Sequence, residues 1–236
     1  MIFANVKKLT IPEGNVIKIT SKGTVIWQKG ANAIPTEYQE VEWLRSTGAN
    51  GPYIDLGFAF DTKGKVEIMC YSEFDTNAYL FGTAENSGAF RCMISCPYGG
   101  TRAYYYGSNG STYIGLSQDI ILGTFNEIEV MWEKENFYAI NKTTGNNTSQ
   151  HKSQVAYTLS TNLYLFGQMY NGTVRTGNGI RQVKRFKYYD KNDNLICSLV
   201  PCYRKSDGVM GMYDIARNIF LTKAGGNDWT KGADVN

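Results

Sequence analysis

The segment Glu127-Ile128-Glu129-Val130-Met131-Trp132-Glu133 places a large apolar residue at every second position. A period of two is typical of a β-strand with one face in the core and the other in solvent, because successive side chains point to opposite sides. We therefore expect Ile128, Val130 and Trp132 to face the core. The glutamates at the intervening positions are predicted to form an ordinary solvent face.

Similar short runs recur along the chain, and turns rich in Gly, Asn and Ser separate them. No segment shows a sustained apolar stripe with helical spacing. Many short strands at roughly regular spacing predict an all-β fold, a two-sheet antiparallel β-sandwich of the jelly-roll kind. The segments 78–82 and 163–167 echo each other, and we interpret them as equivalent strands, one in each half of the sandwich. The clearest runs cover residues 65–71, 103–107, 126–132, 137–141 and 185–189.

The composition of the chain agrees with this fold class. Of 236 residues, 42% are hydrophobic and 14% aromatic, with 25 glycines and only 19% charged residues. The charged share lies below the usual ~25%, whereas helical bundles depend on Glu, Lys, Ala and Leu and contain few glycines. The aromatic content also excludes a disordered chain.

Residues 1–30 form a distinct unit in the sequence. β-branched runs at 6–11, 16–20 and 24–27 are separated by turns, which predicts a three-stranded meander. A sheet of this size buries little apolar surface, so we expect it to dock on the body or on a partner. We therefore divide the chain into an N-terminal β module, 1–30, and a sandwich domain, 31–236. The module residues expected to serve attachment are Lys8, Ile11, Val16, Ile19 and Trp27.

The net charge of +3 is concentrated in this module. Residues 1–30 hold five lysines against one glutamate, a balance of +4, so the rest of the chain carries −1. A nearly neutral body has no broad basic surface, and we expect no nucleic-acid partner. Lysines spread along short strands are typical of protected sheet edges.

The sequence also indicates the cellular compartment in which the protein folds. Residues 1–16 lack the basic and apolar regions of a signal peptide, and no run approaches the ~18 apolar residues of a membrane span. We therefore expect neither a secretion leader nor membrane insertion. The five cysteines are an odd number, which favours free thiols in a reducing compartment.

No set of residues predicts a metal site. Cys197 and Cys202 stand about 16 Å apart on one extended segment, and Cys92 with Cys96 supply only two thiols even if a turn brings them together. The segment 190–194 begins like a calcium loop but lacks the required Gly and terminal Glu, so it is predicted to be a hairpin turn. We expect no cofactor.

A cluster of aromatic residues is the best candidate for a ligand-binding surface. Tyrosine offers a flat face that stacks on the C–H surface of a sugar and a hydroxyl that bonds its hydroxyl groups. Alternation puts Tyr104 and Tyr106 on one face of a strand and Tyr105 on the other, so that one set alternatively fills the core. The candidate ligand-binding residues are Tyr98, Arg102, Tyr104, Tyr106 and Tyr113.

Two blocks of the sequence resemble a known family. Val41-Glu42-Trp43-Leu44-Arg45-Ser46-Thr47-Gly48 followed by Tyr53-Ile54-Asp55-Leu56-Gly57 resembles the opening of concanavalin A-like (laminin-G-type) lectin/glucanase domains of phage and prophage virion proteins. The closing block is similar to the end of these domains, and residues 8–27 resemble short N-terminal modules of similar phage proteins. Between about 85 and 160 only the strand pattern agrees. The closing block comprises 199–204, 211–214, 218–220 and 224–226.

The resemblance implies a virion protein of tail, fibre or capsid, assembled in the cytoplasm of a host bacterium, where free cysteines persist. Residues 1–30 are then expected to bind other virion proteins, while the sandwich adheres to cell-surface or mucus glycans. Weak sugar sites act together in many copies, so we expect a homo-oligomer or multi-copy array. The alternative role is structural decoration of the capsid or tail without glycan binding. A structural Ca²⁺ stays open, because related lectin folds often hold one.

A second alternative is a laminarinase-like glycoside hydrolase. Glu127 and Glu129 share a strand face with Cα atoms ~6.6 Å apart, which is compatible with the ~5–5.5 Å between carboxyl groups of a retaining pair. However, Glu129 replaces the central Asp of that family, and Glu133 comes late. The sole histidine, His151, lies in a polar stretch predicted to be an exposed loop, without a partner for nucleophilic catalysis. We therefore expect the protein not to be an enzyme.

Overall fold

The alternating segments form strands throughout the computed structural model. It describes residues 19–21, 24–27, 34–59, 61, 63–72, 78–84, 91–96, 102–107, 114–117, 121, 123–133, 136–151 and 161–235. These residues form strands and turns, with no helix among them, so the prediction of an all-β fold is confirmed. Accordingly, no described segment is a helix long and apolar enough to cross a membrane.

Strand β11 (Phe125–Glu133) shows how the alternation produces this fold. Ile128, Val130 and Trp132 expose 2% or less of their surface, and the residues between them are more exposed. The predicted core face is therefore confirmed. The indole nitrogen of Trp132 still meets a partner in the core, because it donates a hydrogen bond of 2.9 Å to the Asp61 carbonyl.

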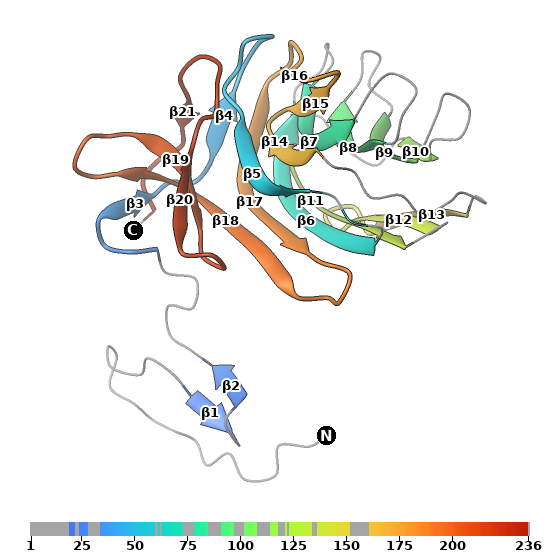
Figure 1. Cartoon of the computed structure of the whole chain (residues 1–236), viewed down its shortest axis with the longest axis horizontal. Helices are drawn as coiled ribbons and strands as arrows, with labels where there is room; N and C mark the ends of the chain where they lie inside the picture. Colours follow the sequence, from blue (N-terminus) through green and yellow to red (C-terminus); the bar gives the residue numbers. More distant parts are fainter. Residues whose placement is uncertain are drawn as a thin grey trace.

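The larger of the two main sheets has eleven strands in the described part of the chain. Besides β11, they are β3 (Tyr38–Glu40), β4 (Leu44–Ser46), β6 (Lys63–Ser72), β12 (Asn136–Asn141), β13 (Asn146–His151), β17 (Arg181–Tyr189), β18 (Leu195–Arg204), β19 (Met210–Asp214), β20 (Ile219–Thr222) and β21 (Thr230–Lys231). Eight follow the order β13-β12-β11-β6-β17-β18-β19-β20 (Figure 1). β3 pairs with β18, and β4 pairs with β17 and β21.

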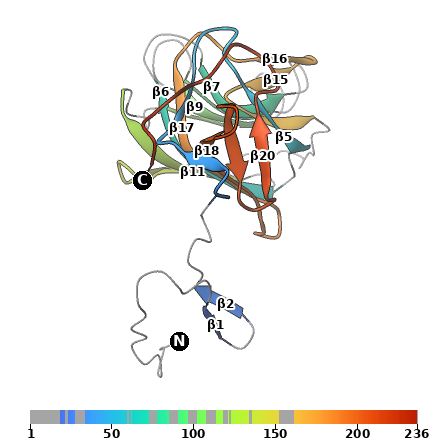
Figure 2. The same ribbon diagram turned by 90° about the vertical axis from the view of Figure 1, so that its left-hand side faces the viewer.

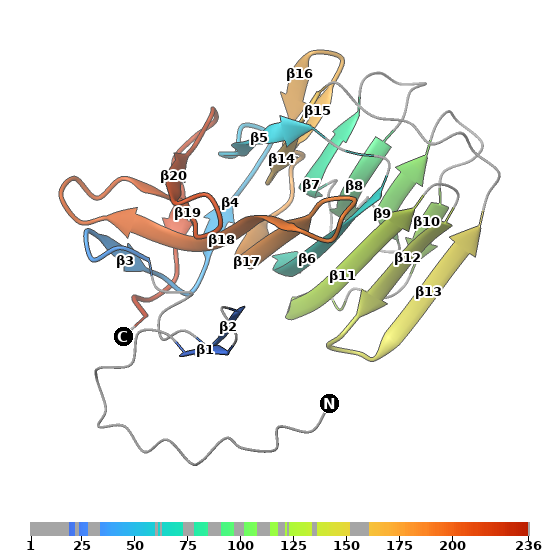
Figure 3. The same cartoon turned by 60° about the horizontal axis from the view of Figure 1, so that its bottom comes forward.

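The smaller sheet has eight strands among the described residues. They are β5 (Ile54–Ala59), β7 (Ala78–Ala84), β8 (Arg91–Cys96), β9 (Arg102–Gly107), β10 (Ile114–Ser117), β14 (Asn162–Leu165), β15 (Gln168–Tyr170) and β16 (Thr173–Arg175). Six follow the order β10-β9-β8-β7-β14-β5, as Figure 3 shows for β7 to β10. β15 pairs with β16 and, in parallel, with β7. The other pairs of this sheet are antiparallel, as predicted.

The two sheets pack face to face and form a β-sandwich, which confirms the predicted two-sheet architecture. The rings of Phe81 on β7 and Phe186 on β17 lie 5.2 Å apart across the core, and both side chains are fully buried. Phe58 on β5 packs in the same way on Tyr188 of β17, at 4.8 Å. Where the strand orders of the two sheets end, β20 of the larger sheet lies beside β5 of the smaller sheet (Figures 1 and 2).

The two blocks that carry the family resemblance meet in the larger sheet. The Val41 amide donates to the Pro201 carbonyl at 2.9 Å, and the Ala224 amide donates to the Tyr53 carbonyl at 2.8 Å. Beside them, β4 runs between β17 and β21 (Figure 1). The side-chain amide of Gln39 donates to the Val235 carbonyl, which joins residues 196 positions apart. The opening of the domain is therefore held by its end.

The larger sheet divides at β17, and this division shapes a pocket described below. Val183 is the last β17 residue to pair with β4, and Phe186 is the first to pair with β18. Between them the register with β6 shifts, which marks a β-bulge at Lys184. Because of the bulge, Lys184 and Arg185 both lie outside the core while Val183 and Phe186 are buried.

Three sequence interpretations are corrected by the fold. The echoing segments 78–82 and 163–167 are not in separate halves, because β7 and β14 are paired neighbours in the smaller sheet. The stretch that ends at His151 is not a loop but the edge strand β13, whose backbone pairs with β12. Cys92 and Cys96 both lie in β8, where four residue steps along the extended strand separate their Cα atoms by about 13 Å.

Two other interpretations are confirmed. The segment 190–194 is a hairpin turn between β17 and β18, and the Asp190 carboxylate accepts hydrogen bonds from the Asn192 and Asn194 amides. Cys197 and Cys202 are separate free thiols.

Part of the N-terminal module is described. β1 (Ile19–Ser21) and β2 (Thr24–Trp27) form a two-stranded antiparallel sheet in which Ile19 lies opposite Trp27. This is the second hairpin of the predicted meander. Lys8, Ile11 and Val16 lie outside the described residues.

Candidate functional site

A row of paired residues crosses six strands of the smaller sheet, from β5 to β10. It runs from Asp55 on β5 through Tyr164, Gly82, Met93 and Tyr105 to Gly115 on β10, each paired with the next. We call these six residues the outer row. Directly paired residues share one face of a sheet, and β5 alternates so that Ile54 and Leu56 are fully buried while Asp55 is not.

At its β5 end, the outer row carries a polar cluster around the Asp55 carboxylate. Its Oδ1 accepts hydrogen bonds from the Gly57 amide at 2.8 Å and from the Asn162 side chain at 2.9 Å. Its Oδ2 accepts one from the Tyr164 hydroxyl at 3.2 Å. A carboxylate has about four acceptor positions, so capacity remains for a further donor such as a sugar hydroxyl.

Aromatic rings border this cluster. Tyr53, which precedes β5, packs edge-on against Tyr164 with the ring centres 6.0 Å apart. Burial, then the Asp55 charge and hydrogen bond, raise the pKa of Tyr164 to about 12, so its hydroxyl stays protonated and donates. A carboxylate, an amide and two phenols in one place combine hydrogen-bonding groups with apolar faces, which is the chemistry that sugars require.

Three of the five predicted ligand residues belong to the far end of the same sheet. Arg102, Tyr104 and Tyr106 lie in β9, and Tyr98 and Tyr113 lie outside the described residues. Tyr104 pairs with Ile94, which pairs with the buried Phe81, whereas the intervening Tyr105 belongs to the outer row. The role of all five predicted residues stays a prediction.

Sequence reasoning missed the cluster around Asp55. Asp55 stood in the opening motif and Tyr164 in the echoing segment, yet nothing in either run shows that β5 and β14 are paired. The signal for a polar site was the lone Asp between Ile54 and Leu56 in an apolar strand.

The two glutamates of the hydrolase alternative lie on the outside of the larger sheet. Glu127 forms an ion pair with Arg185 at 2.7 Å, and Glu129 forms one with Lys142 at 2.8 Å. Glu67, directly opposite Glu129 on β6, is bound in turn by Lys65 at 2.9 Å. Ion pairs among charged side chains, within and between strands, are typical of a solvent-facing sheet surface. The described residues contain no group of three or more His, Cys, Asp or Glu placed to hold a metal ion.

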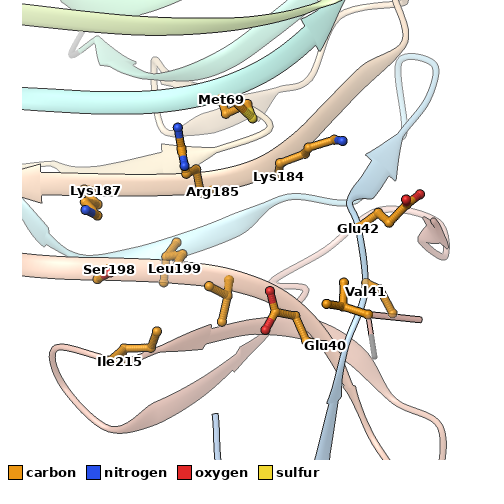
Figure 4. A pocket seen from close by; sticks show the side chains of 12 residues that line it. Glu40, Val41, Glu42, Met69, Lys184, Arg185, Lys187, Ser198, Leu199 and Ile215 are labelled. Carbon is orange, nitrogen blue, oxygen red and sulfur yellow. The ribbon is translucent and has the colours of Figure 1, made fainter. Parts of the chain in front are cut away.

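A pocket of about 450 Å³ opens beside these residues, where the larger sheet divides (Figure 4). It is lined chiefly by Lys184, Arg185 and Lys187 of β17, by residues 198–200 of β18 and by residues 40–42 at the end of β3. We call it the forked-sheet pocket. It lies on the larger sheet, so it is separate from the outer row of the smaller one.

Comparisons with known proteins give distant structural likenesses. No protein-family profile matches the chain, and no curated protein sequence is significantly similar to it. The CBM40 of the Ruminococcus gnavus IT-sialidase, solved with α2,3-sialyllactose, has a TM-score of 0.42 and 14% identity over 59% of this chain and 89% of that one. The tailspike protein 2 of the Escherichia coli O157:H7 bacteriophage CAB120 has a TM-score of 0.38 and 12% identity, over 74% of this chain and 28% of that one. A heptameric SAP-like pentraxin of Limulus polyphemus has a TM-score of 0.30 and 11% identity, over 82% of this chain and 89% of that one. Similarity at this level does not identify a family.

Proposed function

We propose that this protein is a non-catalytic glycan-binding protein whose ligand lies along the outer row of the smaller sheet. The observation that carries this proposal is the Asp55 cluster, in which a partly exposed carboxylate is held by Asn162 and Tyr164 beside the ring of Tyr53. The row continues through Gly82 and Met93 to Tyr105, three strand spacings or about 14 Å from Tyr164, which suits a short oligosaccharide.

The direct test is a glycan array followed by titration of the glycans that bind. Asp55→Asn keeps the size of the side chain but removes the charge that orients the donors, so we expect binding to weaken by about 10-fold or more. Tyr53→Ala removes the ring that borders the cluster, so it should weaken binding as well. Glu133→Gln, on the other sheet, is the matched control. Silence across a broad array, or full binding by Asp55→Asn, contradicts the proposal.

We propose further that the glycan-binding domain is displayed on a phage particle that is assembled in the host cytoplasm. Residues 1–30 attach it to other virion proteins, and many copies together compensate for weak individual sites. The family resemblance and the separate β1–β2 sheet support this role. A cryo-EM map of the particle should show residues 1–30 buried against another virion protein. A map with these residues in solvent, or a particle without the protein, contradicts it.

The absence of catalysis is part of the proposal. Its support is that Glu127 and Glu129 each form a close ion pair, as surface carboxylates do. Incubation with laminarin should release no reducing sugar. Cleavage that disappears in Glu127→Gln or Glu129→Gln contradicts the proposal.

A further inference from the structure

The forked-sheet pocket has one basic wall, supplied by β17. Lys184, Arg185 and Lys187 all line it, because the bulge at Lys184 brings two consecutive residues to the outside of the sheet (Figure 4). Arg185 is held by Glu127, and the Lys187 ammonium lies 4.0 Å from Glu67. The Lys184 ammonium lies 4.4 Å from the centre of the Phe125 ring and has no ion pair within the described part of the chain. One full positive charge is therefore available at this wall.

The opposite wall is acidic. Glu40 and Glu42 line it at the end of β3, and Figure 4 shows their carboxylates apart from the β17 side chains. The Glu40 carboxylate is partly buried, and burial alone raises its pKa, since no described donor bonds to it. A partly desolvated acid without a partner favours a cation or a strong donor at that position.

The floor between the walls is apolar. Val41 and Leu199 are buried, and Met69, Val200, Ile215 and Val235 complete it. No aromatic ring is among the residues that line the pocket, so it offers a sugar no stacking surface. Its volume of about 450 Å³ lies within the usual 300–1,000 Å³ of small-ligand sites and suits a molecule the size of a dipeptide.

From this arrangement we propose that the forked-sheet pocket binds a zwitterionic aliphatic ligand of dipeptide size. The carboxylate of the ligand pairs with Lys184, its ammonium pairs with Glu40, and its aliphatic body lies on the floor formed around Leu199. A ligand with both charges pairs with Lys184 and Glu40 at once, whereas a simple anion leaves Glu40 without a partner. This site is independent of glycan binding on the smaller sheet.

The test is calorimetric titration of the full-length protein with the dipeptide Leu-Leu and two analogues that each lack one charge. Leu-Leu should bind with a dissociation constant of about 1 mM or lower. N-acetyl-Leu-Leu lacks the ammonium and Leu-Leu-amide lacks the carboxylate, and each should bind at least about 10-fold more weakly. Equal binding of all three, or no binding of Leu-Leu at 10 mM, which is about ten times that constant, overturns the proposal.

Variants then assign the two charges to residues. Glu40→Gln should abolish the preference for Leu-Leu over its N-acetyl form, and Lys184→Gln should abolish the preference over the amide. Glu133→Gln, at a residue that does not line the pocket, should change neither preference. Thermal unfolding of each variant checks that it is folded, and a folded Glu40→Gln that retains both preferences also overturns the proposal.

Discussion

The Arg181 guanidinium is buried between two loops and bonds only to neutral acceptors. Nη1 donates to the carbonyls of Thr176 and Gly177, and Nη2 donates to the Ser46 hydroxyl at 2.7 Å and the Gly48 carbonyl at 3.3 Å. Burial lowers its pKa to about 10, which still leaves it charged at neutral pH. One side chain therefore joins the loop after β4 to the loop before β17.

We predict that Arg181→Lys destabilises the fold, although it preserves the charge. A single ammonium cannot reach acceptors in both loops, and buried carbonyls left without donors cost about 2 kcal/mol. For a chain of this length that corresponds to a fall in Tm of roughly 4–8 °C, measured by calorimetry. Arg175→Lys, at an exposed position, is the control, and an equal Tm shift in both variants refutes the special role of Arg181.

At the scale of elements, the pairing of β6 with β11 depends on one glycine. Gly64 lies directly opposite Trp132, and a Cβ atom at Gly64 would lie 2.5 Å from the indole ring. The ring therefore covers the backbone of the neighbouring strand, which only glycine permits. Alternation predicted that Trp132 is buried, but it did not predict which residue lies beneath it, because strand pairing is not encoded in the spacing within one strand.

We predict that Gly64→Ala lowers the free energy of unfolding by about 1–3 kcal/mol, the usual cost of overpacking a core. Denaturant titration should show a lower midpoint with an unchanged slope. Thr173→Ala, on the exposed turn side of β16, should leave the midpoint in place. A Gly64→Ala variant as stable as the parent shows that the indole moves aside without cost.

At the scale of the whole molecule, Asp214 and Arg217 join the two sheets. The buried Asp214 carboxylate accepts from the Ser198 amide of β18 at 2.9 Å and pairs with Arg217, which also donates to the Leu56 carbonyl of β5 at 2.7 Å. Burial opposes ionisation of Asp214, but the Ser198 amide and Arg217 outweigh it and hold its pKa below the ordinary 3.8. The ionised carboxylate is therefore favoured in the folded protein.

The sign of the pH dependence follows from this lowered pKa. Asp214 binds a proton more tightly in the unfolded chain than in the folded protein. Its contribution to the free energy of unfolding is therefore fully present above pH 3.8 and is lost as the pH falls below 3.8 toward the folded-state pKa. We predict that Asp214→Asn lowers stability at pH 7 by about 3 kcal/mol and makes unfolding less dependent on pH below 4. Parallel acid titrations of both proteins, with exposed Asp228→Asn as control, measure the difference; equal slopes contradict the prediction.

The sequence by itself determined that the chain is all-β, which face of β11 is buried and where the Asp190 turn lies. Each of these depends on residues close together in the chain: alternation sets the faces of a strand, and local side-chain bonds set a turn. Only the tertiary structure decided that the echoing strands are neighbours, that Asp55 meets a hydroxyl 109 positions away, and that β17 leaves a charged pocket. These depend on which strands pair and in what register, and that choice minimises the free energy of the whole sandwich, so no local spacing records it.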